Sequence, residues 1–146
     1  MTEIWRKVVL YVAGAWNVIA GTSALLDPRR HFAQLYTASL TLDEPLESFF
    51  YRATWINVIA WGVGYVLAAH DVAQRRPVLL AGAAGKLAYF GAALALFRSG
   101  RGSTALLGFT ALDVVFAALF LYIGLSRPPA RSGSTPPDVA GARPVA

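Results

Sequence analysis

Four long apolar runs divide most of the chain. They cover residues 4–26, 49–69, 77–97 and 103–125. A helix of about 20 residues, at 1.5 Å of rise per residue, crosses a hydrocarbon core of about 30 Å. Helix is the expected conformation because an open strand leaves backbone groups unpaired in lipid. The pattern therefore predicts an all-α fold, with one domain over residues 1–125 that forms an integral membrane antiparallel four-helix bundle.

The connections between the runs differ in length. Residues 71–76 and 98–102 form short connections, so we expect the second and third helices to be neighbours, as well as the third and fourth. The long connection begins with Asp27-Pro28, the pattern of a helix N-cap followed by proline in the first turn. Apolar residues then follow at helical spacing, at Phe32, Leu35 and Tyr36. Residues 28–36 are therefore predicted to form a short amphipathic helix, which either lies on the membrane interface or covers the end of the bundle.

The last 21 residues differ in composition from the rest. Residues 126–146 carry five of the eight prolines, interspersed with glycine, serine and arginine. Such a segment has too little apolar surface to form a core, so we expect a disordered tail.

Composition and charge agree with a membrane protein. Hydrophobic residues make up 56% of the chain and charged residues 14%, more apolar surface than a soluble domain of this size can bury. The net charge is +5, but the basic residues flank the apolar runs, as interfacial anchors do, and form no nucleic-acid-binding stripe. Lysine and arginine residues near the helix ends are slightly more numerous on the membrane side that holds both termini than on the opposite side. This predicts a multi-pass protein of the bacterial inner membrane with cytoplasmic termini.

The residues that could carry redox or metal chemistry are few. The chain has no cysteine, which excludes disulfides, thiolate metal sites and thiol-based catalysis. Its two histidines, His31 and His70, lie in different connections. We therefore expect no metal site and no cofactor.

Four strongly polar side chains interrupt the apolar runs: Asn17, Asn57, Lys86 and Asp113. Lys86 lies 14 residues before Gly100 and Asp113 lies 13 after it, so the two are level in an antiparallel pair. The two asparagines fall at a similar depth. Because polar groups in lipid face the bundle interior, we predict one midplane layer, with Lys86 and Asp113 in direct contact or nearly so. The layer either fixes helix register or binds a proton, ion or small ligand.

Other residues suggest anchoring and packing roles. Arg52 and Asp71 lie near the two ends of the second run and are predicted to be interfacial. Small residues recur every four positions, which predicts faces of close helix approach, at Ala60, Gly64 and Ala68 and at Ala81 and Gly85. Several aromatic residues lie deep in the runs and either pack in the core or against lipid, or line an internal pocket: Trp16, Trp55, Trp61 and Tyr89.

Several short motifs occur in a fixed order between residues 10 and 125. They are Asn17, Pro28, Phe32, Gly62-Val63-Gly64-Tyr65, Ala68-Ala69-His70-Asp71, Arg75-Arg76-Pro77, Gly85-Lys86 and Asp113. Their order and spacing resemble those of a group of small, uncharacterised four-helix bacterial membrane proteins, and the architecture is similar to the DoxX-like group. Some members have an asparagine before the last aspartate, where this chain has Leu112. The resemblance implies a four-helix membrane bundle and no particular reaction.

Three classes of function are compatible with these features. The sequence favours a structural or accessory membrane component over the alternatives. One alternative is a carrier or binder of a small solute, proton or lipid that uses the midplane polar layer. The other is an integral membrane enzyme, although no Ser-His-Asp set and no pair of carboxylates at one depth is present. The expected partners are membrane lipid and a homo-oligomer or larger membrane complex, and nucleic acid is not among them.

Overall fold

The computed structural model describes residues 2–37, 42–72 and 74–126, and the described part of the chain forms five helices. They are α1 (Glu3–Leu26), α2 (Pro28–Leu35), α3 (Pro45–Ala68), α4 (Arg76–Arg98) and α5 (Thr104–Leu125). The all-α prediction is confirmed. The helix count is five rather than four, because the predicted short segment after Asp27 forms a helix of its own. The predicted disordered tail lies outside the described residues, except for Ser126.

Three of the long helices are long and apolar enough to cross a membrane, judged by length and composition: α1, α4 and α5. The helix α3 is as long as α1, with 24 residues, but Glu47, Arg52 and Asn57 lower its hydropathy. It also begins at Pro45, four residues before the apolar run, because proline fits the first turn of a helix. Of the four predicted spans, three therefore meet this criterion, and α3 does not.

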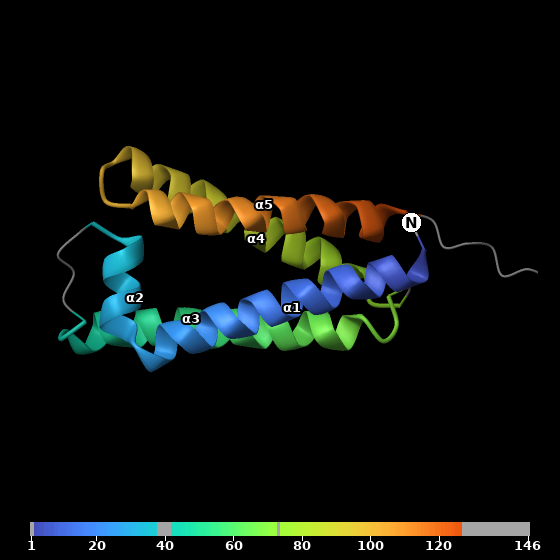
Figure 1. Cartoon of the computed structure of the whole chain (residues 1–146), viewed down its shortest axis with the longest axis horizontal. Helices are drawn as coiled ribbons and strands as arrows, with labels where there is room; N and C mark the ends of the chain where they lie inside the picture. The colour runs from blue at the N-terminus through green and yellow to red at the C-terminus, as the bar shows by residue number, and fades with distance from the viewer. Residues whose placement is uncertain (1, 38–41, 73, 127–146) are drawn as a thin grey trace, which may run out of the picture.

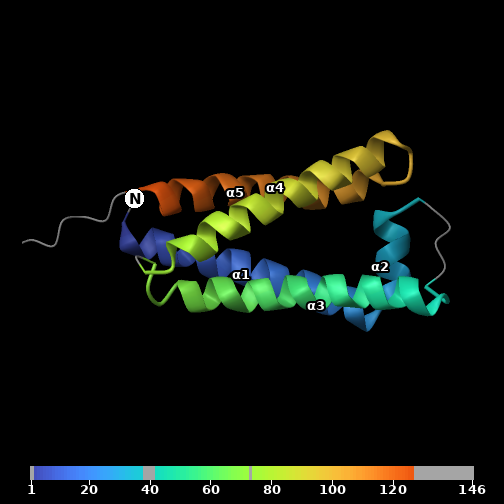
Figure 2. The ribbon, with the colours of Figure 1, turned by 180° about the vertical axis from the view of Figure 1, so that it is seen from behind.

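The long helices form two layers, α1 with α3 and α4 with α5 (Figure 1). The helices within each layer are antiparallel, so the start of α1 and the end of α5 lie at the same end of the bundle (Figure 1). The layers approach each other at that end and diverge toward the opposite end, where α2 lies between them (Figure 2). The predicted neighbours α4 and α5 pack closely, but α3 and α4 make few contacts with each other. The short connection of residues 71–76 therefore joins two helices that separate.

Glycines bring α1 and α3 together. A methyl group added at Gly14 would lie 2.8 Å from the carbonyl oxygen of Gly62, and one added at Gly21 would lie 2.9 Å from that of Trp55. Only glycine permits such close contact between helix backbones. The predicted faces of close approach were wrong in this respect, since a methyl group at Gly64 or Gly85 would meet nothing within 4 Å.

The helix α2 closes the open end of the bundle. The side chain of Asp27 accepts a hydrogen bond from the backbone N–H of Arg30 at 3.2 Å, as expected for the predicted N-cap. At the other end of α2, the backbone N–H of Ser103 donates to the Leu35 carbonyl at 2.9 Å, and the Ser103 hydroxyl donates to the Gln34 carbonyl at 2.7 Å. These bonds connect α2, which follows α1, to the start of α5. The helix predicted at residues 28–36 is confirmed, and it covers the end of the bundle.

The buried side chains form two clusters, one toward each end. The larger cluster fills the end at which the layers meet and includes Leu10, Tyr65, Leu79 and Phe120, each at most 2% exposed. The smaller cluster lies near α2 and includes Leu35, Trp55 and Leu106. The midplane polar residues lie between these two clusters.

Candidate functional site

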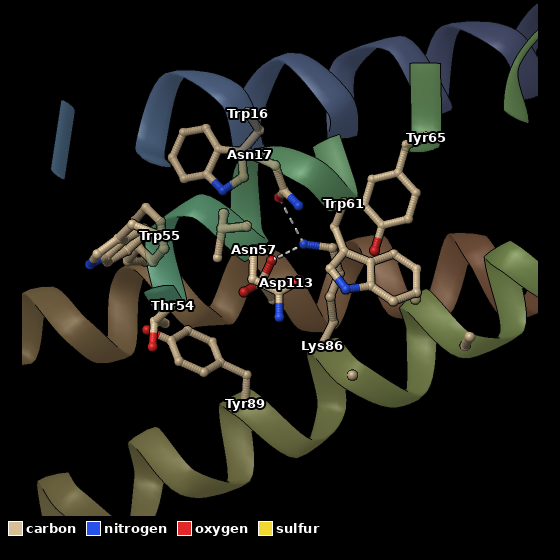
Figure 3. Close-up of a pocket in the computed structure, with 15 residues that line it drawn as sticks. Trp16, Asn17, Thr54, Trp55, Asn57, Trp61, Tyr65, Lys86, Tyr89 and Asp113 are labelled. Atoms are coloured by element: carbon tan, nitrogen blue, oxygen red, sulfur yellow. Dashed lines mark hydrogen bonds and ion pairs between the residues drawn. The ribbon is translucent and has the colours of Figure 1, made fainter. Parts of the chain in front are cut away.

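Lys86, Asp113 and Asn17 meet in the middle of the bundle. They come from α4, α5 and α1 and are 7%, 6% and 6% exposed, respectively. The Lys86 ammonium forms an ion pair with the Asp113 carboxylate, and it also donates a hydrogen bond to Asn17 Oδ1 at 3.2 Å (Figure 3). The predicted contact between Lys86 and Asp113 is confirmed.

Local sequence explains why the pair meets. Gly100 has a φ of +73° in the turn between α4 and α5, a conformation that favours glycine. The turn places two helices of equal rise side by side, so residues at equal distances from it are level. On α5, Asp113 shares one buried face with Thr110, Ala117 and Phe120. The carboxylate is thereby turned toward α4 rather than outward.

Aromatic rings complete the surroundings of the lysine. The Lys86 nitrogen lies 5.9 Å from the centroid of the Tyr65 ring and 5.5 Å from that of Phe116. These distances are within the range of cation–π attraction to an ammonium group. The aromatic rings of α3 and α5 thus surround the ion pair.

A cavity of about 260 Å³ lies beside the pair. Its wall contains all four residues of the predicted midplane layer together with six aromatic side chains, namely Trp16, Trp55, Trp61, Tyr65, Tyr89 and Phe109 (Figure 3). Asn57 differs from the other three polar residues, because it is exposed and makes no hydrogen bond with its amide among the described residues. The structure therefore joins three of the predicted residues through polar contacts and places the fourth on the wall of the cavity.

The cavity opens between α3 and α4. The exposed residues of its wall all belong to these two helices: Thr54, Asn57, Ala81, Gly85 and the large Trp61, which is 38% exposed. The helices α3 and α4 contact each other only sparsely, so the opening lies between them.

A larger cavity of about 910 Å³ lies closer to α2. Thr54 and Trp55 belong to the walls of both cavities. Burial raises the pKa of Tyr36 on the wall of the larger cavity, and the nearby side chain of Tyr89 on the wall of the smaller one partly offsets this effect. The two cavities thus adjoin each other at Thr54 and Trp55.

The two predicted interfacial residues lie away from the charged pair. Arg52 is exposed and its Nε donates to the Ser48 hydroxyl at 3.4 Å. The Asp71 carboxylate accepts from the backbone N–H of Gln74 at 3.2 Å, which stabilises the turn between α3 and α4. Neither residue belongs to the wall of the cavity beside the pair.

Comparison with known proteins adds no relative. The chain matches no protein-family model, and no curated protein or solved structure is significantly similar to it. The resemblance to small DoxX-like membrane proteins therefore stays a prediction, and the site is interpreted from its own geometry.

Sequence reasoning left the deep aromatic residues undecided. Four had been noted, Trp16, Trp55, Trp61 and Tyr89, and all four line the cavity. The sequence did not predict that Tyr65 and Phe109 line the cavity. Their positions could have been inferred from helical spacing, because Tyr65 lies four residues after Trp61 and Phe109 lies four residues before Asp113, so each pair shares a helix face. Within the described residues, no group of three or more histidine, aspartate or glutamate side chains could hold a metal ion.

Proposed function

We propose that this chain is a multi-pass membrane protein that binds a small uncharged molecule in the cavity beside Lys86 and Asp113, as a receptor or carrier. One observation carries the proposal: the buried ion pair forms part of the wall of an open, aromatic cavity instead of a sealed layer. This favours a binding role over the purely structural role that the sequence favoured. Concave, mostly apolar sites with a few convergent polar groups are typical of small-molecule binding.

The charge balance favours an uncharged ligand. Lys86 and Asp113 are the only lysine, arginine, aspartate or glutamate side chains on the described wall of this cavity, and they neutralise each other. An anionic or cationic ligand would compete for one member of the pair and leave the other buried without compensation, which is costly. An uncharged ligand avoids this cost and can pack against the aromatic rings.

The membrane location rests on the exterior of the bundle as well as on its helix lengths. Large apolar side chains are exposed along the helices, for example Val12, Ile19, Ile56 and Val115. In water such a surface would promote aggregation, whereas lipid covers it without cost. We place both termini in the cytoplasm because basic residues are slightly more frequent on that side. Reporter fusions to the two ends test this placement, and opposite locations of the ends would contradict the antiparallel arrangement.

Tryptophan fluorescence offers a direct binding assay. The chain has four tryptophans, and Trp16, Trp55 and Trp61 line the cavity, while Trp5 does not. The Trp5→Phe variant in detergent micelles should therefore report mainly on the site. We expect saturable quenching by the uncharged aromatic ketone 9-fluorenone. We expect much weaker quenching by tetraphenylphosphonium, a cation, and by naphthalenesulfonate, an anion.

Two glycines on α4 provide a matched pair of variants. A methyl group added at Gly85 or at Gly91 would meet nothing within 4 Å, but only Gly85 lines the cavity. Gly85→Leu should fill the cavity and abolish saturable quenching, while Gly91→Leu should retain it, with unchanged helix content by circular dichroism in both. Equal binding by the two variants, or no saturable binding of any probe, would overturn the proposal and favour a structural role.

A further inference from the structure

We infer that the ligand is a carbonyl compound dissolved in the bilayer, which enters sideways between α3 and α4 and accepts a hydrogen bond from the Asn57 amide. This inference rests on the proposed function and specifies its ligand class and its route of entry. Three observations carry it: the amide of Asn57, which has no hydrogen-bond partner among the described residues, the surplus of hydrogen-bond donors on the wall, and the buried side chains that obstruct the other routes.

Asn57 is the polar residue without a described partner. Its counterpart Asn17 accepts a hydrogen bond from Lys86, but the amide of Asn57 makes none within the described part of the chain. The side chain lies among the cavity-lining residues near Lys86 and Asp113 (Figure 3). An amide without a partner is costly in an apolar environment. A ligand that hydrogen-bonds to Asn57 would remove this cost, so the position of Asn57 at the mouth of the cavity is consistent with a role in ligand binding.

Donors predominate on the wall. Besides the two N–H groups of Asn57, the wall contains the hydroxyls of Tyr65 and Tyr89 and the indole N–H of Trp16, which is buried and has no hydrogen-bond partner in the part of the chain that the structure describes. Carboxylate and amide oxygens are fewer, and one oxygen of Asp113 and that of Asn17 already accept from Lys86. An uncharged ligand that complements this wall carries an acceptor oxygen on an apolar frame.

Buried side chains obstruct the other routes to the cavity. Toward the end of the bundle where the layers meet, Leu79, Tyr65 and Phe120 are at most 2% exposed and fill the space between the layers. Toward α2, the cavity adjoins its larger neighbour at Thr54 and at Trp55, and Trp55 is only 2% exposed. The exposed part of the wall lies on α3 and α4, and in a bilayer the gap between these helices faces lipid.

The ligand class is tested with two probes that have the same planar skeleton. Fluorene lacks the carbonyl group of 9-fluorenone. After each affinity is corrected for the partition of the probe into empty micelles, the ratio of the two affinities reports on the hydrogen bond to the carbonyl oxygen. We expect 9-fluorenone to bind about five-fold more tightly, the value of one ordinary hydrogen bond. In Asn57→Leu the ratio should fall to about one, while fluorene still binds. An unchanged ratio in Asn57→Leu, or equal binding of both probes to the original chain, would overturn the inference.

The route of entry is tested by spin labelling, since the chain has no cysteine of its own. Ala81 is an exposed residue at the α3–α4 gap, and Thr37 is an exposed residue beside α2. In liposomes, a nitroxide on Ala81→Cys should collide with dissolved oxygen and be shielded from an aqueous nickel chelate, while one on Thr37→Cys should be reached by the chelate. Access of the chelate to Ala81→Cys would overturn lateral entry.

The two proposals fail in different ways. If neither fluorene nor 9-fluorenone binds saturably, the proposed binding function itself is wrong. In the other case, both probes bind, Gly85→Leu prevents their binding, and Asn57→Leu does not change the ratio of their affinities. The binding function then stands and the assignment of the ligand class is wrong.

Discussion

The charged pair allows a quantitative test of how the bundle is held together. We predict that Lys86→Met and Asp113→Leu each destabilise the protein strongly, whereas the double variant is close to the original chain in stability. The reason is that each single change leaves the remaining charge buried, and the double change leaves none. Met is close in volume to Lys, whereas Leu is larger than Asp, and the cavity beside Asp113 offers room for the added volume.

The expected magnitude follows from the burial and the contacts of the pair. Lys86 and Asp113 are 7% and 6% exposed, and Asn17 is the one other side chain in the described chain that hydrogen-bonds to the pair. Removal of one member of such a pair costs about 3–5 kcal/mol, whereas replacing a whole pair by apolar residues is often neutral. The coupling free energy is the cost of the double change minus the sum of the two single costs, and its magnitude should therefore be about 6 kcal/mol or more.

The assay is a double-mutant cycle in detergent micelles. Unfolding of the four proteins by increasing fractions of dodecyl sulfate is followed by far-ultraviolet circular dichroism and tryptophan fluorescence. If the changes in unfolding free energy of the two single variants sum to that of the double variant within about 0.5 kcal/mol, the two residues do not interact and the reasoning is refuted. A double variant as unstable as either single variant would show that the ion pair contributes net stability of its own.

Three further predictions concern local features. Gly82→Ala should destabilise by about 1–3 kcal/mol in the same unfolding assay, because its methyl group would lie 2.5 Å from the Tyr65 hydroxyl, whereas Gly85→Ala, with open space, should stabilise the helix by up to about 1 kcal/mol. Asp27→Ala should cost about 1 kcal/mol through the lost N-cap and speed hydrogen exchange in α2. Burial lowers the pKa of His31 below its ordinary value of 6.5; stability should therefore be full above about pH 6.5 and fall as the pH decreases, and His31→Gln should remove this slope in thermal unfolding.

The depth of the polar residues could be predicted from the sequence. Counting from Gly100 placed Lys86 and Asp113 at the same level, because helix rise is constant and the turn is short. The direction of each side chain followed from the high cost of a charge that faces lipid. The N-cap at Asp27 was equally predictable, since it depends on neighbouring residues alone.

The contacts between helices could not be predicted in the same way. A short connection suggested that α3 and α4 are neighbours. It brings their adjacent ends together, but it does not determine the angle between the two helix axes. The spacing of small residues pointed to Gly64 and Gly85, whereas Gly14 and Gly62 make the close contact. Spacing defines a face of a helix, and which face meets a partner depends on how all the side chains pack together.

The same packing explains why a cavity lies at the charged pair. Backbone contact through glycines fixes α1 to α3, and α5 fixes α4, so each layer behaves as a unit. The layers diverge beyond Tyr65, and the pair lies where the separation begins. The bond from Lys86 to Asn17 is a polar contact across the two layers at this depth. The sequence-level cost of a buried charge and the glycine contacts therefore act at the same depth: the first joins Lys86, Asp113 and Asn17, and the second holds the helices that carry them in two separate layers.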